Sequence, residues 1–211
     1  MKRHRQSSTL TAERLHQRNV RREIAFRAGR LLAEDGTLNA AAAAQKASRQ
    51  MGVTTQRSLP DASEIEVALK AHQTLFQADS QPQECAFLRQ TAADIMRRLD
   101  RFSPWLFGAV LSGLANRFSP IELEIVTDNA KQLEMFFLNE KISFETHVRR
   151  FHKTKRVDST KETVIYTFSF DGISIVIYAY SHPSEQNAAH RQKQMKIERA
   201  QLVEVERLFN F

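Results

Sequence analysis

The sequence predicts an α+β protein in which a helical N-terminal region precedes a mixed sheet with flanking helices. As far as Phe102, apolar residues recur at the spacing of an α-helix. After Pro104 the period changes to two, which is the period of β-strands. Two β-rich runs then flank Asp171-Gly172, a dipeptide that favours a tight hairpin turn. These observations divide the chain into a basic flexible arm, a helical domain, an α+β domain and a C-terminal helix, at residues 1–10, 11–103, 104–182 and 183–211.

Four helices are expected in the helical domain. The first runs from about Thr11 to Asp35, and its buried stripe includes Ile24 and Ala28. An Ala-rich helix follows and ends at Gly52. In the third helix Ser63 and Glu66 fit a capping box, and the expected inner face is Ile65, Leu69, His72 and Phe76. The fourth helix covers 82–102, and the arginines near its end, Arg97, Arg98 and Arg101, suit the helix dipole.

The α+β domain is expected to contain strands, one helix and a hairpin. Residues 105–111 form a strand that runs into a turn, and 121–126 alternate strictly, as in a half-buried strand. A helix over 128–141 and a strand over 143–151 follow. The hairpin spans 163–181, and a helix over 185–209 ends the chain.

Charge is concentrated at the N-terminus. Residues 1–30 contain nine Lys and Arg against Glu13 and Glu23, so their net charge of +7 equals that of the whole chain. A block of positive charge favours contact with a phosphate backbone. The expected nucleic-acid contacts in the arm are Lys2, Arg3, Arg5, Arg14, Arg18, Arg21 and Arg22. The alternative is a solvated, partly disordered tail.

Composition favours a cytoplasmic protein. The basic start is followed by no apolar segment, so we expect no secretory signal, and no apolar run is long enough to span a membrane. Cys85 is the single cysteine, which excludes an internal disulfide and fits a partly buried thiol in a reducing cytoplasm.

The stretch from Gly108 to Leu123 resembles a motif of the DNA polymerase beta superfamily of small nucleotidyltransferases. The family pattern is G-S-x-A-R-G, five residues, then S-D-I-D-L. Laid on this chain without a gap, it reads Gly108-Ala109-Val110-Leu111-Ser112-Gly113, five residues, then Ser119-Pro120-Ile121-Glu122-Leu123. The order of elements around it also resembles the minimal family core. A second similarity, over 31–36 and 59–69, is to uncharacterised bacterial proteins described as nucleotidyltransferase-like.

The resemblance implies a metal-dependent site, and this chain departs from it. Nucleotidyl transfer uses two divalent cations held by carboxylates, which the family supplies at the two aspartates and on a later strand. Here Pro120 replaces the first aspartate, Glu122 replaces the second, and the later strand 173–181 contains no acid. Glu122 and Glu124 can still share one face of a strand, which leaves an active enzyme with Mg²⁺ and a nucleoside triphosphate as an alternative. Alternatively, both glutamates face solvent while their apolar neighbours face the core.

Two further features are expected to contribute to binding. The turn at Gly108, Ala109, Ser112 and Gly113 is a candidate nucleotide or phosphate site, because backbone amides at such a turn need no particular side chain. A second basic run is a candidate phosphate contact or merely a charged strand end: Arg149, Arg150, Lys153, Lys155 and Arg156. Aromatic residues interleaved nearby belong either to the core or to a surface that stacks RNA bases.

The prediction is a catalytically degenerate nucleotidyltransferase-like protein, of bacterial type, that binds RNA or a ribonucleoprotein through residues 2–30. It has no metal site or cofactor and no membrane partner. The rivals are the active nucleotidyltransferase using Glu122 and Glu124, and a protein-interaction module whose arm docks on an acidic partner.

Overall fold

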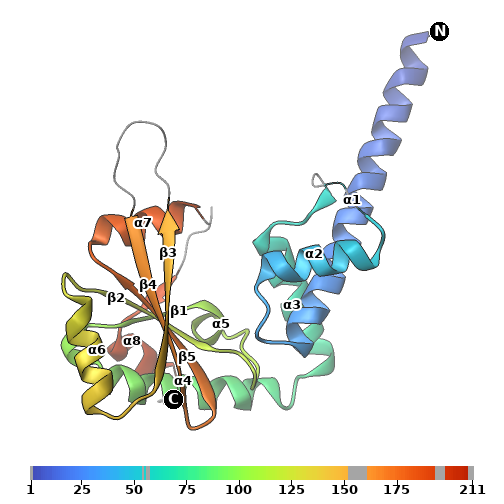
Figure 1. Ribbon diagram of the computed structural model, residues 1–211. Coiled ribbons are helices and arrows are strands. Elements are labelled where there is room, and N and C mark those ends of the chain that lie inside the picture. The colour runs from blue at the N-terminus through green and yellow to red at the C-terminus, as the bar shows by residue number, and fades with distance from the viewer. Residues whose placement is uncertain (1, 54, 56–57, 152–160, 193–197, 209–211) are drawn as a thin grey trace. The chain divides into compact units, whose positions relative to one another are not determined.

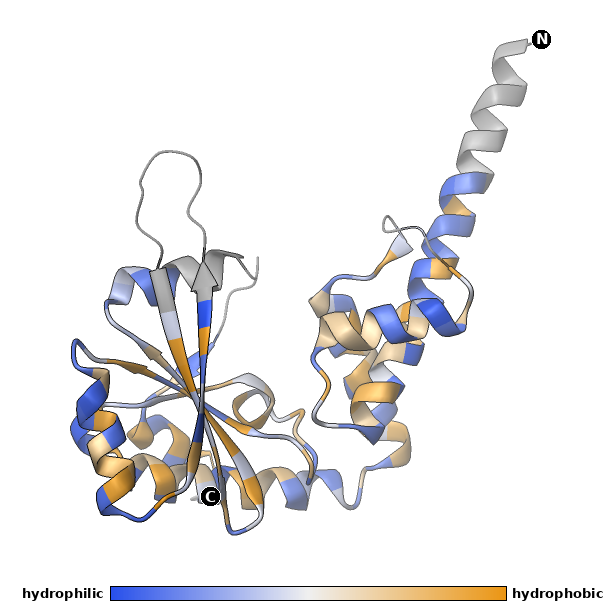
Figure 2. Ribbon diagram, viewed as in Figure 1, coloured by the Kyte–Doolittle hydropathy of each residue, from blue (hydrophilic) through white to orange (hydrophobic). Residues whose placement is uncertain are grey.

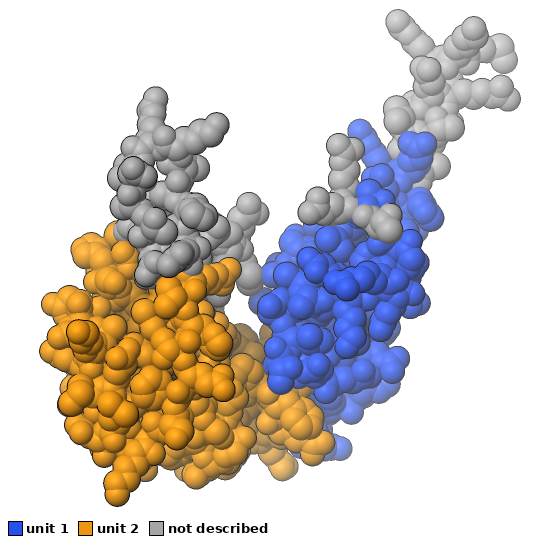
Figure 3. All heavy atoms as spheres, viewed as in Figure 1, with its two compact units in different colours: residues 1–80 blue, residues 81–211 orange. Residues whose placement is uncertain are grey.

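The computed structural model describes residues 2–53, 55, 58–151, 161–192 and 198–208, and it divides the chain into two compact units. The N-terminal unit is 1–80 and the C-terminal unit is 81–211 (Figure 3). Together they form the predicted α+β architecture, with a helical N-terminal region and a mixed sheet flanked by helices. Within the described residues, no helix combines the length and the apolar character that crossing a bilayer requires.

The N-terminal unit is a three-helix assembly (Figure 1). Its helices are α1 (Lys2–Glu34), α2 (Ala40–Gln50) and α3 (Ala62–Phe76). Ile24, Ala28 and Ile65 are buried in its core together with alanines of α2, which confirms the predicted stripe. Gly29 allows α1 to approach α3 closely, because a Cβ there would lie 2.7 Å from the backbone nitrogen of Leu69.

Three local predictions for this unit were wrong. Helix α1 begins at Lys2, so residues 2–10 continue the helix that was expected to start at Thr11. The capping box of α3 is formed by Asp61 and Glu64, because Asp61 accepts from the N3 amide and Glu64 accepts from the N-cap amide. Phe76, expected on the inner face, is 69% exposed.

The C-terminal unit contains a six-stranded mixed sheet in the order β3-β4-β5-β2-β1-β6. Its strands are β1 (Trp105–Phe107), β2 (Ile121–Val126), β3 (Phe144–Phe151), β4 (Lys161–Phe170), β5 (Ile173–Tyr180) and β6 (Arg199–Ala200). The central pair β2–β5 is parallel, and the other four pairs are antiparallel. The helices are α4 (Gln81–Arg98), the 3-10 helix η2 (Asp100–Phe102), α5 (Gly108–Ser112), α6 (Ala130–Asn139), α7 (Pro183–Gln192) and α8 (Leu202–Arg207).

The hairpin prediction is confirmed. Strands β4 and β5 pair antiparallel, and Asp171 and Gly172 have φ of 49° and 79°. Positive φ at both central residues is the geometry that gives a two-residue turn the twist of the flanking strands.

One face of the sheet carries the core. Ile121, Leu123 and Ile125 of β2 are fully buried there, as the alternation predicted, beside apolar residues of α4 and α6. Figure 2 shows the apolar character of the central strands. Tyr166 and Phe168 pack around Phe137, so these interleaved aromatic residues belong to the core rather than to a base-stacking surface.

The structure places two boundaries differently from the sequence prediction. Helix α4 belongs to the C-terminal unit, so the units divide at Ser80 and not near residue 103. The single C-terminal helix expected over 185–209 was wrong: α7 and α8 are separate helices, and β6 lies between them. Strand β6 pairs with β1, a non-local hydrogen-bonding partner that helical periodicity alone does not reveal.

Candidate functional site

Glu122 and Glu124 lie on the face of the sheet opposite the core. Their positions at i and i+2 on β2 place them on one face, as predicted. The alternative that both glutamates face solvent was wrong, because Glu124 is 1% exposed and Glu122 is half-buried. This face therefore holds a buried polar site.

Glu124 accepts hydrogen bonds from two later elements and lies beside a third. Gln186 of α7 donates its Nε2 to Oε2 over 2.7 Å, and the Tyr180 hydroxyl of β5 donates to Oε1 over 3.3 Å. Nη1 of Arg199, on β6, lies 3.7 Å from Oε2. The Arg199 guanidinium also lies over the Trp105 ring, 5.5 Å from its centroid. The carboxylate thus joins β2 to three segments that follow it by fifty residues or more.

Glu122 lies against the glycine turn. Tyr178 donates its hydroxyl to Oε1 over 3.4 Å, and a Cβ added to Gly108 would lie 2.1 Å from Oε2. Gly108 has φ of 77°, in the left-handed region that favours glycine. The structure therefore brings together the predicted acidic residue and the predicted glycine turn, and the carboxylate occupies the space beside Gly108.

Three residues of α4 hold the other side of this turn. Gln81 donates Nε2 to the carbonyls of Gly113 and Ala115, both over 2.8 Å. Arg89 donates Nε to Val110 and Nη2 to Leu111, over 3.0 and 2.9 Å.

Cys85 lies between these two side chains, and its Sγ is 3.7 Å from the Val110 carbonyl. Burial raises the pKa of the Cys85 thiol, which keeps it a donor. The residue is 4% exposed, so it is more deeply buried than the sequence predicted. Sequence reasoning missed this support, although the spacing of four between Gln81, Cys85 and Arg89 is visible in the sequence.

Strand β5, on which the family resemblance implies a third carboxylate, provides two tyrosine hydroxyls instead. The register of β2 and β5 places Tyr178 beside Glu124, and the Tyr178 and Tyr180 hydroxyls reach the two glutamates. Burial, followed by the charge of Glu122, raises the pKa of Tyr178 to about 12. Burial and Glu124 likewise raise the pKa of Tyr180 well above its ordinary value. Both phenols are therefore neutral donors near pH 7.

The donor set does not fit a pair of magnesium ions. Pro120 offers no side-chain oxygen, and both oxygens of Glu124 already accept hydrogen bonds. Among the residues that the structure describes, no three His, Cys, Asp or Glu side chains gather into a cluster able to hold a metal.

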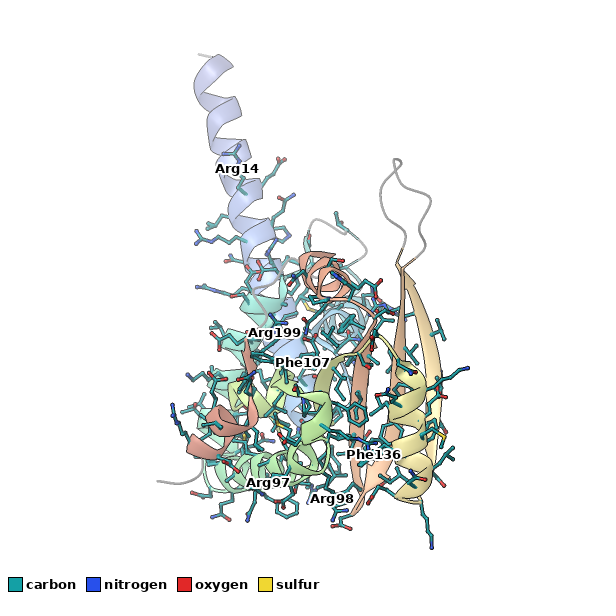
Figure 4. All side chains as sticks on the ribbon, turned by 90° about the vertical axis from the view of Figure 1, so that its left-hand side faces the viewer. Arg14, Arg97, Arg98, Phe107, Phe136 and Arg199 are labelled. Atoms are coloured by element: carbon teal, nitrogen blue, oxygen red, sulfur yellow. The ribbon has the colours of Figure 1, made fainter. Side chains whose placement is uncertain are left out.

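The predicted basic residues whose side chains are described fall into three groups. Arg14, Arg18 and Arg22 of α1 are exposed, and Figure 4 labels Arg14 on the part of the helix that extends beyond α2 and α3. Arg21 has an internal role instead: it donates Nε to Glu64 over 2.7 Å and pairs with Asp61 over 3.3 Å. Arg149 is exposed, and its charge offsets a small part of the rise in pKa that burial and the glutamates cause at Tyr178 and Tyr180.

The structure does not describe the side chains of the other predicted basic residues. Lys153, Lys155 and Arg156 lie outside the described residues, as do the side chains of Lys2, Arg3, Arg5 and Arg150.

Tyrosine titration offers a direct test of this site. The chain contains three tyrosines, and the pKa of each is raised by burial and by a neighbouring glutamate. Phenols held neutral in the folded state contribute stability below pH 10, and this contribution is lost as the pH rises through about 12. We expect little tyrosinate absorbance at 295 nm until the pH passes about 11, at which point unfolding accompanies ionisation. A midpoint near pH 10 with the fold intact would contradict the buried geometry.

Comparison with known proteins identifies a family but no function. No curated protein and no solved structure matches the chain. A family model, Domain of unknown function (DUF4269), matches residues 89–210, which include the whole sheet, the glycine turn and both glutamates. Because this match covers more than half of the sequence, the chain belongs to the DUF4269 family.

Proposed function

We propose that this protein is a cytoplasmic, catalytically degenerate relative of the polymerase beta-like nucleotidyltransferases that binds RNA, free or within a ribonucleoprotein, through helix α1. The observation that carries the proposal is a row of exposed arginines on α1, Arg14, Arg18 and Arg22, that form no ion pair with any residue the structure describes. Neither Mg²⁺ nor a nucleoside triphosphate has a role in it.

The arginine row has the geometry of a phosphate-binding surface. Arg14, Arg18 and Arg22 are four residues apart, so they lie on one face of α1 and are separated by about 6 Å along it. All three are exposed, and none forms an ion pair with another described residue. Further along the helix, Arg27 and Arg30 are neutralised by Glu23 and Glu34. Among the arginines of α1 whose side chains are described, the unpaired ones are therefore those of the row.

The helix around the row has no packing role to explain it. Residues 13–19, which include Arg14 and Arg18, are exposed on every side, while the contacts of α1 with the core of its unit begin at Val20. A helix that is polar all round gains little from the rest of its own unit. A bound polyanion would supply the missing stabilisation, because each neutralised phosphate releases counterions.

The acidic site supports loss of catalysis. Glu124 is occupied by Gln186 and Tyr180, and Glu122 is held by Tyr178 against Gly108. These contacts use the carboxylate oxygens that metal ions would need, so the site supports a structural role for both glutamates.

Substitution of the row tests the proposal. We expect Arg14→Gln/Arg18→Gln/Arg22→Gln to weaken binding of a single-stranded RNA about tenfold at 150 mM salt and to lower the salt slope by about 2, because three phosphate contacts are lost. Fluorescence anisotropy over a range of salt concentrations measures both quantities. The matched control is Arg27→Gln/Arg30→Gln, which removes arginines of the same helix that are already paired.

Two other results would overturn the proposal. Metal-dependent transfer from a labelled nucleoside triphosphate, abolished by Glu122→Gln, would establish the enzyme instead. Failure of the native chain to bind RNA, together with co-purification of one acidic protein after nuclease treatment, would establish the protein-interaction module.

A further inference from the structure

A second cationic surface lies in the C-terminal unit, between η2 and α6. The groove there has a volume of about 450 Å³, and the residues on its walls that matter for recognition are Arg101, Phe102, Asn129, Lys131, Gln132 and Asn139. This volume lies in the range of pockets that hold small-molecule ligands, about 300–1,000 Å³.

The lining combines cations and carboxamides without any acid. Arg101 and Lys131 are exposed, and neither forms an ion pair with another described residue. Three side-chain amides complete the polar lining, and no carboxylate is among the residues that line the groove. Such a surface attracts an anion and offers both donors and acceptors to its polar edges.

Aromatic rings hold Arg101 in place. Its guanidinium lies 4.6 Å from the ring centroid of Phe102 and 4.9 Å from that of Phe136 (Figure 4 labels Phe136). Stacking on rings leaves the guanidinium N–H groups available for a phosphate. The sequence predicted that Arg101 lies at the C-terminal end of the fourth helix. This was wrong, because α4 ends at Arg98 and Arg101 lies in η2.

We propose that this groove binds one nucleotide of a single-stranded RNA, with the cations on its phosphate and the carboxamides on the base edge. The inference rests on the proposed function, since it extends RNA binding to the C-terminal unit. Single-stranded RNA fits best because its bases are free to be read by amides, whereas those of a duplex are paired. Cation–π contacts between arginine and aromatic rings recur in proteins that bind single-stranded nucleic acids.

Paired variants of the full chain test the groove separately from α1. We expect Arg101→Gln/Lys131→Gln to weaken binding of a fluorescein-labelled uridine 12-mer about fivefold and to lower the salt slope by about 1. Gln132→Ala/Asn139→Ala is expected to weaken binding about threefold with the slope unchanged, because amides contact bases and not phosphates. The control, Lys141→Gln/Arg207→Gln, removes two exposed cations of the same unit that do not line the groove.

Cross-linking shows where the RNA binds without relying on a measured affinity. An oligonucleotide that contains 4-thiouridine is expected to cross-link to the α6 peptide that includes Met135, which also lines the groove. The cross-link should survive in the triple arginine variant of α1, and its yield at a subsaturating RNA concentration should fall about fivefold in the double variant of Arg101 and Lys131. Thermal melting of each variant checks that the fold is retained.

The outcomes separate the two proposals. If the native chain binds RNA but the groove variants match the control and no cross-link forms at α6, the groove inference fails and the α1 proposal stands. If only the groove variants lose binding, the groove stands and the assignment to α1 fails. If uridine monophosphate displaces the strand at equal concentration, the groove is a mononucleotide site and the inference of a strand is wrong. A native chain that binds no RNA overturns both.

Discussion

Gly108→Ala is expected to destabilise the C-terminal unit by about 3 kcal/mol, because two separate costs add. An L-residue at φ of 77° costs about 1–2 kcal/mol. The new Cβ would also lie 2.1 Å from Oε2 of Glu122, and relief of such overpacking costs about 1–3 kcal/mol. Guanidinium unfolding followed by Trp105 fluorescence measures the change, since the single tryptophan of the chain lies in this unit.

Two comparisons divide the effect into its parts. Gly172 has φ of 79° with nothing within 4 Å of its added Cβ, so Gly172→Ala is expected to show the backbone cost alone, about 1 kcal/mol. Adding Gly108→Ala to Glu122→Ala should cost about as much as Gly172→Ala, because the contact with Oε2 is gone. Equal destabilisation by Gly108→Ala and Gly172→Ala in the native background would mean that Glu122 does not lie against the turn.

Strand alternation was sufficient to predict which residues of β2 share a face. Ile121, Leu123 and Ile125 are buried because a strict period of two places them on the core side, and this placed both glutamates on the opposite face. What covers that opposite face was not predictable. The groups that enclose Glu124 come from α7, β5 and β6, and no local pattern in the sequence specifies a contact across such separations.

The same limit explains the error at the C-terminus. Residues 185–209 have helical spacing, yet Arg199 and Ala200 form a strand because β1 supplies hydrogen-bonding partners for them. That pairing also positions Arg199 beside Glu124. The error in secondary structure and the missed partner of the candidate site therefore have one physical cause, a tertiary contact that overrides local helical preference.

The arginines of α1 show that the sequence does not predict which charged side chains form internal ion pairs. The sequence treats Arg18, Arg21 and Arg22 alike, since all belong to one basic block. The structure separates them, because Arg21 alone points to Asp61 and Glu64 at the start of α3. A block of positive charge in the sequence thus predicts an anionic partner for the surface, but it does not predict which of its arginines form ion pairs within the protein.

Glu124→Ala is expected to cost about 3–5 kcal/mol, the range for the loss of one partner from a buried charge pair. The variant leaves the Gln186 amide and the Tyr180 hydroxyl without their acceptor, and it removes the negative charge 3.7 Å from Arg199, in a site where Glu124 is 1% exposed. Glu124→Gln keeps the shape but turns an N–H group toward donors, so we expect about 2 kcal/mol. The control is Glu206→Gln, which breaks a surface ion pair with Arg97 and should cost less than about 1 kcal/mol.

The stability of these variants also decides between the two roles of Glu124. A carboxylate kept for metal binding is held in a strained environment, and its removal commonly stabilises the fold while activity is lost. A carboxylate kept to join β2 to α7, β5 and β6 has the opposite effect, because its removal leaves buried donors unsatisfied. We expect the second result, together with a shift in Trp105 emission as Arg199 loses its partner. Glu124→Gln that unfolds at the same or a higher denaturant concentration than the native chain would reopen the case for a catalytic acid at this position.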